Sequence, residues 1–115
     1  MKIELQEGNH MLTVRLYGEL DYHTVGKVRE VIDKAIAQAV GKTLLLNLAG
    51  VPFMDSSGLG LILGRYRRFC EQPGQFILTT PASQVRRLLE LSGVDRIIPI
   101  YNTEEEAYQL REEVE

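Results

Sequence analysis

The sequence of 115 residues has one cysteine, no excess of basic charge and no long apolar segment. Because Cys70 stands alone, an internal disulfide is excluded, and the charged, alternating N-terminal residues do not read as a signal peptide. No apolar run approaches the ~20 residues that a membrane helix needs, so we expect no association with a membrane. Together these absences predict a protein of the reducing cytoplasm.

The net charge and the scarcity of metal-ligating residues argue against nucleic acid and against metal ions as partners. The formal net charge is -3 and no large basic stretch occurs, which argues against binding to nucleic acid. The one dense basic cluster, Arg65, Arg67 and Arg68, is interpreted as a solvated face. His10 and His23 have no companions at metal-ligand spacing, so we expect neither a metal site nor a cofactor.

The apolar pattern predicts one α/β domain over residues 1–115. Its predicted order is β-β-α-β-α-β-α-β-α, with an initial antiparallel β-hairpin and a mostly parallel sheet of about five strands covered by about four helices. The predicted strands are residues 2–6, 12–17, 44–48, 75–79 and 97–100. Pro99 places the last strand at an edge of the sheet.

Side chains that cap helices mark where the predicted helices begin. Asp21 or Thr24 precedes a first helix with apolar positions from Val25 to Ala39, and the run Thr80-Pro81 suggests a cap followed by a proline at the first helical position. Thr103 and Glu106 have the spacing of a capping box. The final helix is expected to bury Ala107, Leu110 and Val114.

The segment 53–65, Phe-Met-Asp-Ser-Ser-Gly-Leu-Gly-Leu-Ile-Leu-Gly-Arg, is the most informative part of the chain. It connects an apolar strand to an amphipathic helix that opens with Ser56 and Ser57. Helix N-termini offer unpaired N–H groups and partial positive charge, which favour phosphate. Two hydroxyl groups beside Asp55 therefore suggest a position where phosphate is attached or recognised. The alternative is that one serine simply caps the helix.

A helical projection divides this helix into two faces. The predicted core face holds Leu59, Ile62, Leu63, Tyr66, Phe69 and Cys70, and the opposite face holds Ser57, Gly60, Leu61, Gly64, Arg68 and Glu71. Gly60 and Gly64 each cost about 1 kcal/mol against alanine inside a helix. They either allow a partner backbone to approach beside an exposed Leu61 or pack against a loop of the same chain. The projection leans toward Ser57 as the reactive serine without excluding Ser56.

Catalytic interpretations find little support. Ser56-Ser57-Gly58 lacks the G-x-S-x-G pattern of hydrolases, and only His23 offers a base that could approach it. The run Gly58 to Gly64 resembles a dinucleotide fingerprint but spaces its third glycine wrongly. We therefore expect a protein that is not an enzyme.

Several of these segments resemble one known family. The runs 18–21 and 53–60, the apolar strand ending in Asn47-Leu48, and Ser92-Gly93 resemble the STAS domain of bacterial anti-sigma factor antagonists. The longer runs 18–24 and 53–68 are most similar to the antagonists of the sporulation anti-sigma F factor. Tyr22 departs from that pattern, where a histidine is expected.

The resemblance implies a partner-switching mechanism. The unphosphorylated antagonist binds an anti-sigma factor that is also a serine kinase carrying ATP or ADP, and so frees a sigma factor, here sigma F. Phosphorylation releases the antagonist, and a PP2C-type serine phosphatase restores it. Carried onto this chain, the phosphorylated residue is Ser56, with Ser57 as the alternative. The expected partner-binding residues are Asp21, Asp55, Ser57, Gly58, Gly60, Leu61, Gly64 and Arg68. A structural or scaffold STAS module of a stress-signalling assembly is the competing hypothesis.

Overall fold

The structure, a computed structural model, describes the backbone of residues 1–114 and the side chains of residues 1–109. The strands are β1 (Lys2–Glu7), β2 (Met11–Tyr17), β3 (Thr43–Gly50), β4 (Gln75–Thr79) and β5 (Ile100–Tyr101). The helices are α1 (Val25–Gln38), α2 (Ser56–Phe69), α3 (Ser83–Leu91), the short 3₁₀ helix η1 (Val94–Arg96) and α4 (Glu104–Val114). The predicted order of strands and helices is thus confirmed.

The strands form one sheet in the order β1-β2-β3-β4-β5. The hairpin is antiparallel, with a register that runs from Lys2 opposite Tyr17 to Glu7 opposite Leu12. All later pairs are parallel. The predicted hairpin and mostly parallel sheet are therefore confirmed, and β5 lies at an edge as Pro99 suggested.

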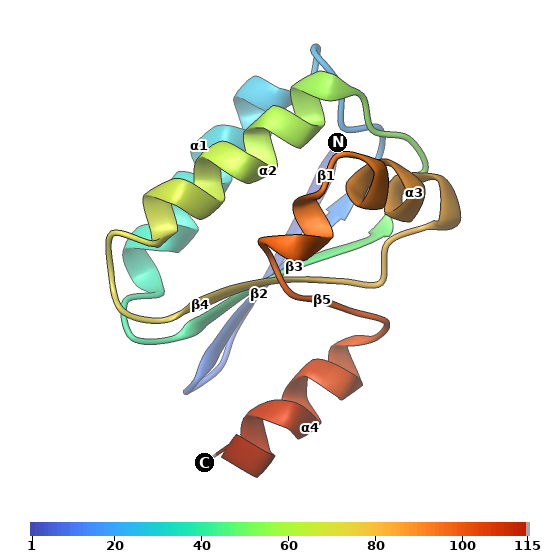
Figure 1. The fold of residues 1–115 in the computed structure, drawn as a ribbon. Coiled ribbons are helices and arrows are strands. Elements are labelled where there is room, and N and C mark those ends of the chain that lie inside the picture. Colours follow the sequence, from blue (N-terminus) through green and yellow to red (C-terminus); the bar gives the residue numbers. More distant parts are fainter. Residues whose placement is uncertain (115) are drawn as a thin grey trace.

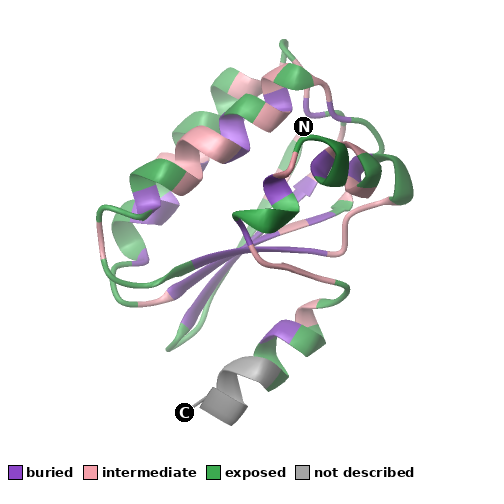
Figure 2. Ribbon diagram, viewed as in Figure 1, coloured by how far each residue is buried: buried purple, intermediate pink, exposed green. Residues whose placement is uncertain are grey.

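Helices cover the two faces of the sheet unequally. Figure 1 shows α1, α2 and α3 on one face and α4 alone on the other. Alternate residues of β3 supply both sides: Leu44, Leu46 and Leu48 belong to the large core beneath the three helices, whereas Leu45 packs toward Ala107 of α4. The three central strands β2, β3 and β4 are accordingly mostly buried, whereas β1 at the edge is mostly exposed (Figure 2). This arrangement fixes α2 firmly against the sheet.

Polar contacts attach α4 to its face of the sheet. Arg15 Nε and Nη2 donate to the two carboxylate oxygens of Glu104, each at 2.8 Å, and the Asn47 amide also donates to Glu104. The hydrogen bonds from Arg15 hold the pKa of the Glu104 carboxyl below its ordinary value. The Thr103 half of the capping box is confirmed, because Glu106 N–H donates to Thr103 Oγ1. The Glu106 carboxylate reaches one residue farther than expected and accepts from Asn102 N–H. The expected buried positions Leu110 and Val114 lie outside the described side chains.

Two local predictions in the last third of the chain are wrong. The third helix starts at Ser83 with Ala82 as its N-cap, and Thr80 instead adopts a left-handed conformation with φ of 55°. Residues 97 and 98 are not in a strand, because the N–H groups of Ile97 and Ile98 both donate to the Val94 carbonyl and extend the η1 turn. Local hydrogen bonds at η1 therefore leave only two residues for β5.

Candidate functional site

The N-terminus of α2 is capped by an aspartate, not by a serine. Asp55 Oδ1 accepts hydrogen bonds from the N–H groups of Ser57 at 2.9 Å and Gly58 at 3.2 Å. The cap satisfies two of the unpaired donors of the helix and places a negative charge at its positive end. The interpretation in which a serine side chain caps the helix is therefore wrong. Neither the Ser56 nor the Ser57 hydroxyl is needed as the cap.

The two serines differ in exposure. Ser56, the first residue of α2, is exposed, whereas Ser57 is half-buried. Within residues 1–109 neither hydroxyl takes part in a hydrogen bond. The helical projection leaned toward Ser57, and the burial of the two side chains reverses that preference. The reason is that projection angles describe the middle of a helix and not its first residue.

The loop that contains Leu20 packs against the start of α2. Leu20 N–H donates to the Phe53 carbonyl at 3.0 Å, and Asp55 N–H donates to the Leu20 carbonyl at 3.3 Å. Leu20 and Met54 form an isolated parallel bridge. A Cβ atom on Gly58 would lie only 2.5 Å from the Leu20 carbonyl oxygen. Gly58 is therefore required by close packing inside the molecule, and it shapes the site without presenting a contact.

Asp21 organises the turn that leads into α1. Its Oδ1 accepts from His23 N–H at 2.9 Å, and its own N–H donates to Thr24 Oγ1 at 3.0 Å. Thr24 is the N-cap residue of α1, but its hydroxyl donates to the Glu19 carbonyl and makes no cap bond to the helix. Asp21 is half-buried, so part of it remains accessible next to the Leu20–Met54 bridge.

Two exposed aromatic side chains flank this site and were missed by sequence reasoning. Tyr22 is 76% exposed and Phe53 is 46% exposed. They lie on the two loops that pair through Leu20 and Met54, directly before α1 and α2. Large apolar side chains inside turn segments are the signal that would have indicated them. Their exposure is typical of a surface that another protein covers.

The outer face of α2 has two glycines that the fold does not require. Gly60 is exposed and Gly64 is half-buried, and a Cβ atom on either would meet no atom within 4 Å. Packing against a loop of the same chain is therefore excluded as their explanation among the described residues. Arg68, farther along this face, keeps about half of its side chain exposed (55%) and lies 3.3 Å from Asp33 of α1. A smooth helical strip thus runs from the serines toward Arg68.

Leu61 does not belong to that exposed strip. Its side chain is 4% exposed and lies in the main core, while Cys70, assigned to the core by the projection, is exposed. The expected exposure of Leu61 is therefore wrong. The helix is covered by the sheet and also by α1, which lies alongside it (Figure 1), so its buried face is wider than the projection assumed.

The charge around the start of α2 is negative, because Asp21 and Asp55 form no ion pair with a described residue. The ion pairs among residues 1–109 lie elsewhere, at Arg15–Glu104, Lys42–Glu7, and Arg65 and Arg68 with Asp33. In the same part of the chain no cluster of three His, Cys, Asp or Glu residues could hold a metal ion. No helix formed by the described residues is long and apolar enough to cross a membrane. The site thus offers hydroxyls, carboxylates and aromatic rings.

Comparison with known proteins places this chain in a family. A family model described as the STAS domain matches residues 2–107. The anti-sigma F factor antagonist of Paenibacillus polymyxa is 42% identical over 104 residues, which are 90% of this chain and 89% of that protein. The solved structure of the anti-sigma factor antagonist SpoIIAA in its unphosphorylated form has a TM-score of 0.77 at 37% identity, with 96% of both chains covered. The Bacillus cell fate determinant SpoIIAA in its phosphorylated form has a TM-score of 0.68 at 37% identity, with 94% of this chain and 97% of that chain covered. These matches over nearly the whole length show that the chain belongs to the STAS domain family.

Proposed function

We propose that this protein is an anti-sigma factor antagonist that acts by binding and not by catalysis. In its unmodified form it binds an anti-sigma factor serine kinase and so frees a sigma factor, with sigma F of sporulation as the expected one. Phosphorylation of Ser56 releases the kinase, and a PP2C-type phosphatase restores the unmodified form. The relative from Paenibacillus polymyxa, named an anti-sigma F factor antagonist, supports this proposal.

The observation that carries the proposal is the exposed, uncommitted hydroxyl of Ser56. Asp55 caps the helix in its place, so phosphate on Ser56 costs no structural hydrogen bond. A phosphoserine carries about −1.5 to −2 charges at neutral pH. At an exposed helix N-terminus such a charge is favourable by about 0.3–1 kcal/mol. Modification therefore leaves the fold intact, and its effect is exerted on the partner.

Electrostatics explain how one phosphate switches the interface. Asp21 and Asp55 already give the patch negative character, which suits a basic surface on the kinase. Phosphate adds bulk and further negative charge where the two proteins would meet. Close contact with the Ser56 end of α2 is then lost through steric overlap and desolvation of the phosphate.

The docking surface combines the start of α2 with its outer strip. Its residues are Asp21, Tyr22, Phe53, Asp55, Ser57, Gly60, Gly64 and Arg68. Tyr22 and Phe53 supply the apolar contacts that usually carry binding energy, and the two glycines allow close approach along α2. Buried Leu61 and Gly58 support this surface from inside.

Incubation with the cognate anti-sigma kinase and ATP, followed by intact mass measurement, tests the proposal. We expect the mass of one phosphate per chain, and the same kinase should bind the unmodified protein in the presence of nucleotide. A chain that neither binds nor accepts phosphate would instead support the scaffold hypothesis.

A further inference from the structure

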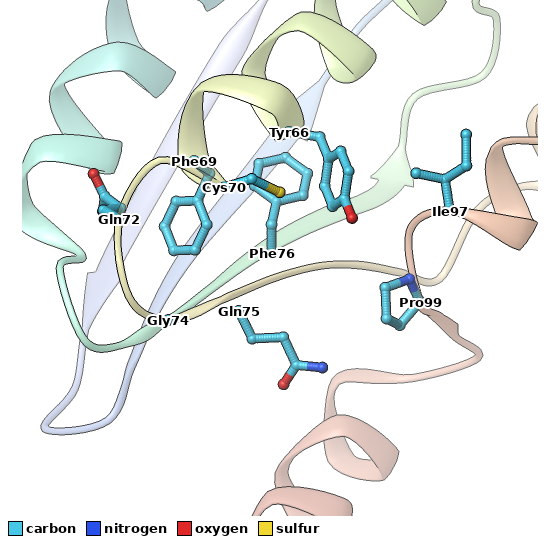
Figure 3. Close-up of a pocket in the computed structure, with 9 residues that line it drawn as sticks. All are labelled: Tyr66, Phe69, Cys70, Gln72, Gly74, Gln75, Phe76, Ile97 and Pro99. Atoms are coloured by element: carbon cyan, nitrogen blue, oxygen red, sulfur yellow. The ribbon is translucent and has the colours of Figure 1, made fainter.

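A pocket lies at the end of α2 opposite to Ser56. Its cavity volume is about 350 Å³, and Figure 3 shows it between the last turn of α2, the beginning of β4 and the segment 97–99. This size falls within the range of small-molecule sites in proteins. The 14 residues of α2 place it about 20 Å from the serine end of the helix. The proposed docking surface therefore does not account for it.

Three aromatic rings form the inner wall of the pocket. Phe69 and Phe76 are nearly fully buried, and their ring centroids lie 5.9 Å apart. Tyr66 meets Phe76 edge to face at 6.0 Å. Such ring pairs hold one another in fixed orientations. The wall is thus preformed: the buried rings of Phe69 and Phe76 hold the half-buried ring of Tyr66 in place at the cavity (Figure 3).

The rim of the pocket is polar but carries no formal charge. Its polar side chains are Tyr66, Cys70, Gln72 and Gln75. The Gln72 amide already donates to the Ile36 carbonyl at 2.8 Å, which leaves the Tyr66 hydroxyl and the exposed Gln75 amide as the principal groups for a ligand. A side-chain hydrogen bond with Cys70 and, second, burial raise the pKa of the Tyr66 hydroxyl. Because the ordinary pKa of tyrosine is already about 10, this hydroxyl is protonated at neutral pH and can donate to a ligand.

The outer lip of the pocket is apolar. Pro99 closes one side, and Ile97, the residue that follows η1, is 52% exposed. Figure 3 shows Ile97 and Pro99 across the opening from Tyr66. A flat ring inserted between them would cover apolar surface on both of its faces.

We propose that this pocket is a binding site for a small uncharged aromatic molecule that carries a single hydrogen-bonding group. The aromatic wall and the apolar lip select a flat ring, and the rim supplies hydrogen-bond partners without an ion to pair with a charged ligand. A charged ligand would lose hydration without compensation. The site is separate from the Ser56 switch and does not depend on it.

Titration of the ¹⁵N-labelled protein with indole tests the proposal. Indole is expected to shift the amide signals of residues 66–76 and 97–100 with a saturable, millimolar dissociation constant. Indole-3-carboxylate has the same ring with a negative charge, and we expect it to bind at least about fivefold more weakly. Shifts that fail to saturate up to about 10 mM, that centre elsewhere, or that are equal for the two compounds would overturn the proposal.

A pair of adjacent variants makes the test specific to the pocket. Cys70→Phe adds a ring at a lining position and should weaken indole binding about tenfold or more. Glu71→Phe adds the same ring at the next, exposed residue, which does not line the pocket, and should leave binding unchanged. Circular dichroism and melting temperature establish that each variant is folded. Equal effects of the two variants on indole binding would contradict the assignment of the site to this pocket. The comparison of indole with indole-3-carboxylate is made on the unmodified chain, so it tests the proposal even if a variant does not fold.

Discussion

Asp55 Oδ1 accepts the backbone N–H of Ser57 at 2.9 Å, and this hydrogen bond determines the chemistry of the site. Because the aspartate is the cap, the hydroxyl of the intervening Ser56 stays exposed. We expect Asp55→Ala to lower the free energy of unfolding by about 0.5–2 kcal/mol through loss of the cap. Asp55→Asn, which can still accept these hydrogen bonds, should lose less. Urea denaturation measures both, and equal stability of Asp55→Ala and the unmodified chain would contradict the role of the cap.

Ser56→Asp tests whether negative charge acts at the interface and not on the fold. The variant should weaken kinase binding at least about tenfold through charge and size. Its circular dichroism and melting temperature should stay near those of the unmodified chain, because the helix N-terminus favours an anion. Calorimetry with the kinase measures the affinity. An unfolded variant would argue against a switch that works at the interface alone.

Gly60 on the outer strip and buried Gly58 are two glycines of α2 whose replacement by alanine should have opposite effects on stability. Gly60→Ala should raise the free energy of unfolding by about 0.5–1 kcal/mol, because no atom lies within 4 Å of the new Cβ, and yet it should weaken kinase binding. Gly58→Ala should lower stability by about 1–3 kcal/mol, because its Cβ meets the Leu20 carbonyl at 2.5 Å. Thermal unfolding and affinity are measured for each. If Gly60→Ala binds as well as the unmodified chain, the strip is not a contact surface.

The lowered pKa of Glu104 predicts a dependence of stability on pH. Hydrogen bonds from Arg15 favour the carboxylate in the folded state, so the unfolded chain binds this proton more readily. The stabilisation is therefore complete above the unfolded pKa of about 4.3 and is lost as the pH falls through the folded value. Urea denaturation at pH 7 and pH 3 should show Glu104→Gln less stable than the unmodified chain at pH 7, with a smaller difference at pH 3. Glu105→Gln, at the exposed neighbouring position, serves as the control, and its loss of stability between pH 7 and pH 3 should match that of the unmodified chain.

Most of the fold follows from patterns of apolar residues in the sequence. Alternation over residues 2–6 and 12–17 predicts the hairpin, and the continuous apolar run from Leu44 marks the central strand buried on both faces. Local signals in the sequence predicted the helix starts and turns of the last third of the chain less well. The left-handed Thr80 and the η1 turn depend on hydrogen bonds and packing that a propensity argument does not contain.

The candidate site was predictable in position but not in detail. Sequence reasoning found the serines, Asp55 and the glycines. It misplaced Leu61, because a helical projection assumes one buried side and α2 is covered by both the sheet and α1. It did not predict that the rings of Tyr22 and Phe53 are exposed, or that the Leu20–Met54 bridge brings their two loops together.

The central claim is that Ser56 accepts phosphate and that this modification decides whether a kinase partner stays bound. The most direct measurement is intact mass after incubation with the cognate anti-sigma kinase and ATP, made on the unmodified chain, on Ser56→Ala and on Ser57→Ala. We predict one phosphate on the unmodified chain and on Ser57→Ala, and none on Ser56→Ala. A phosphate retained by Ser56→Ala, or its absence from all three proteins, would contradict the account.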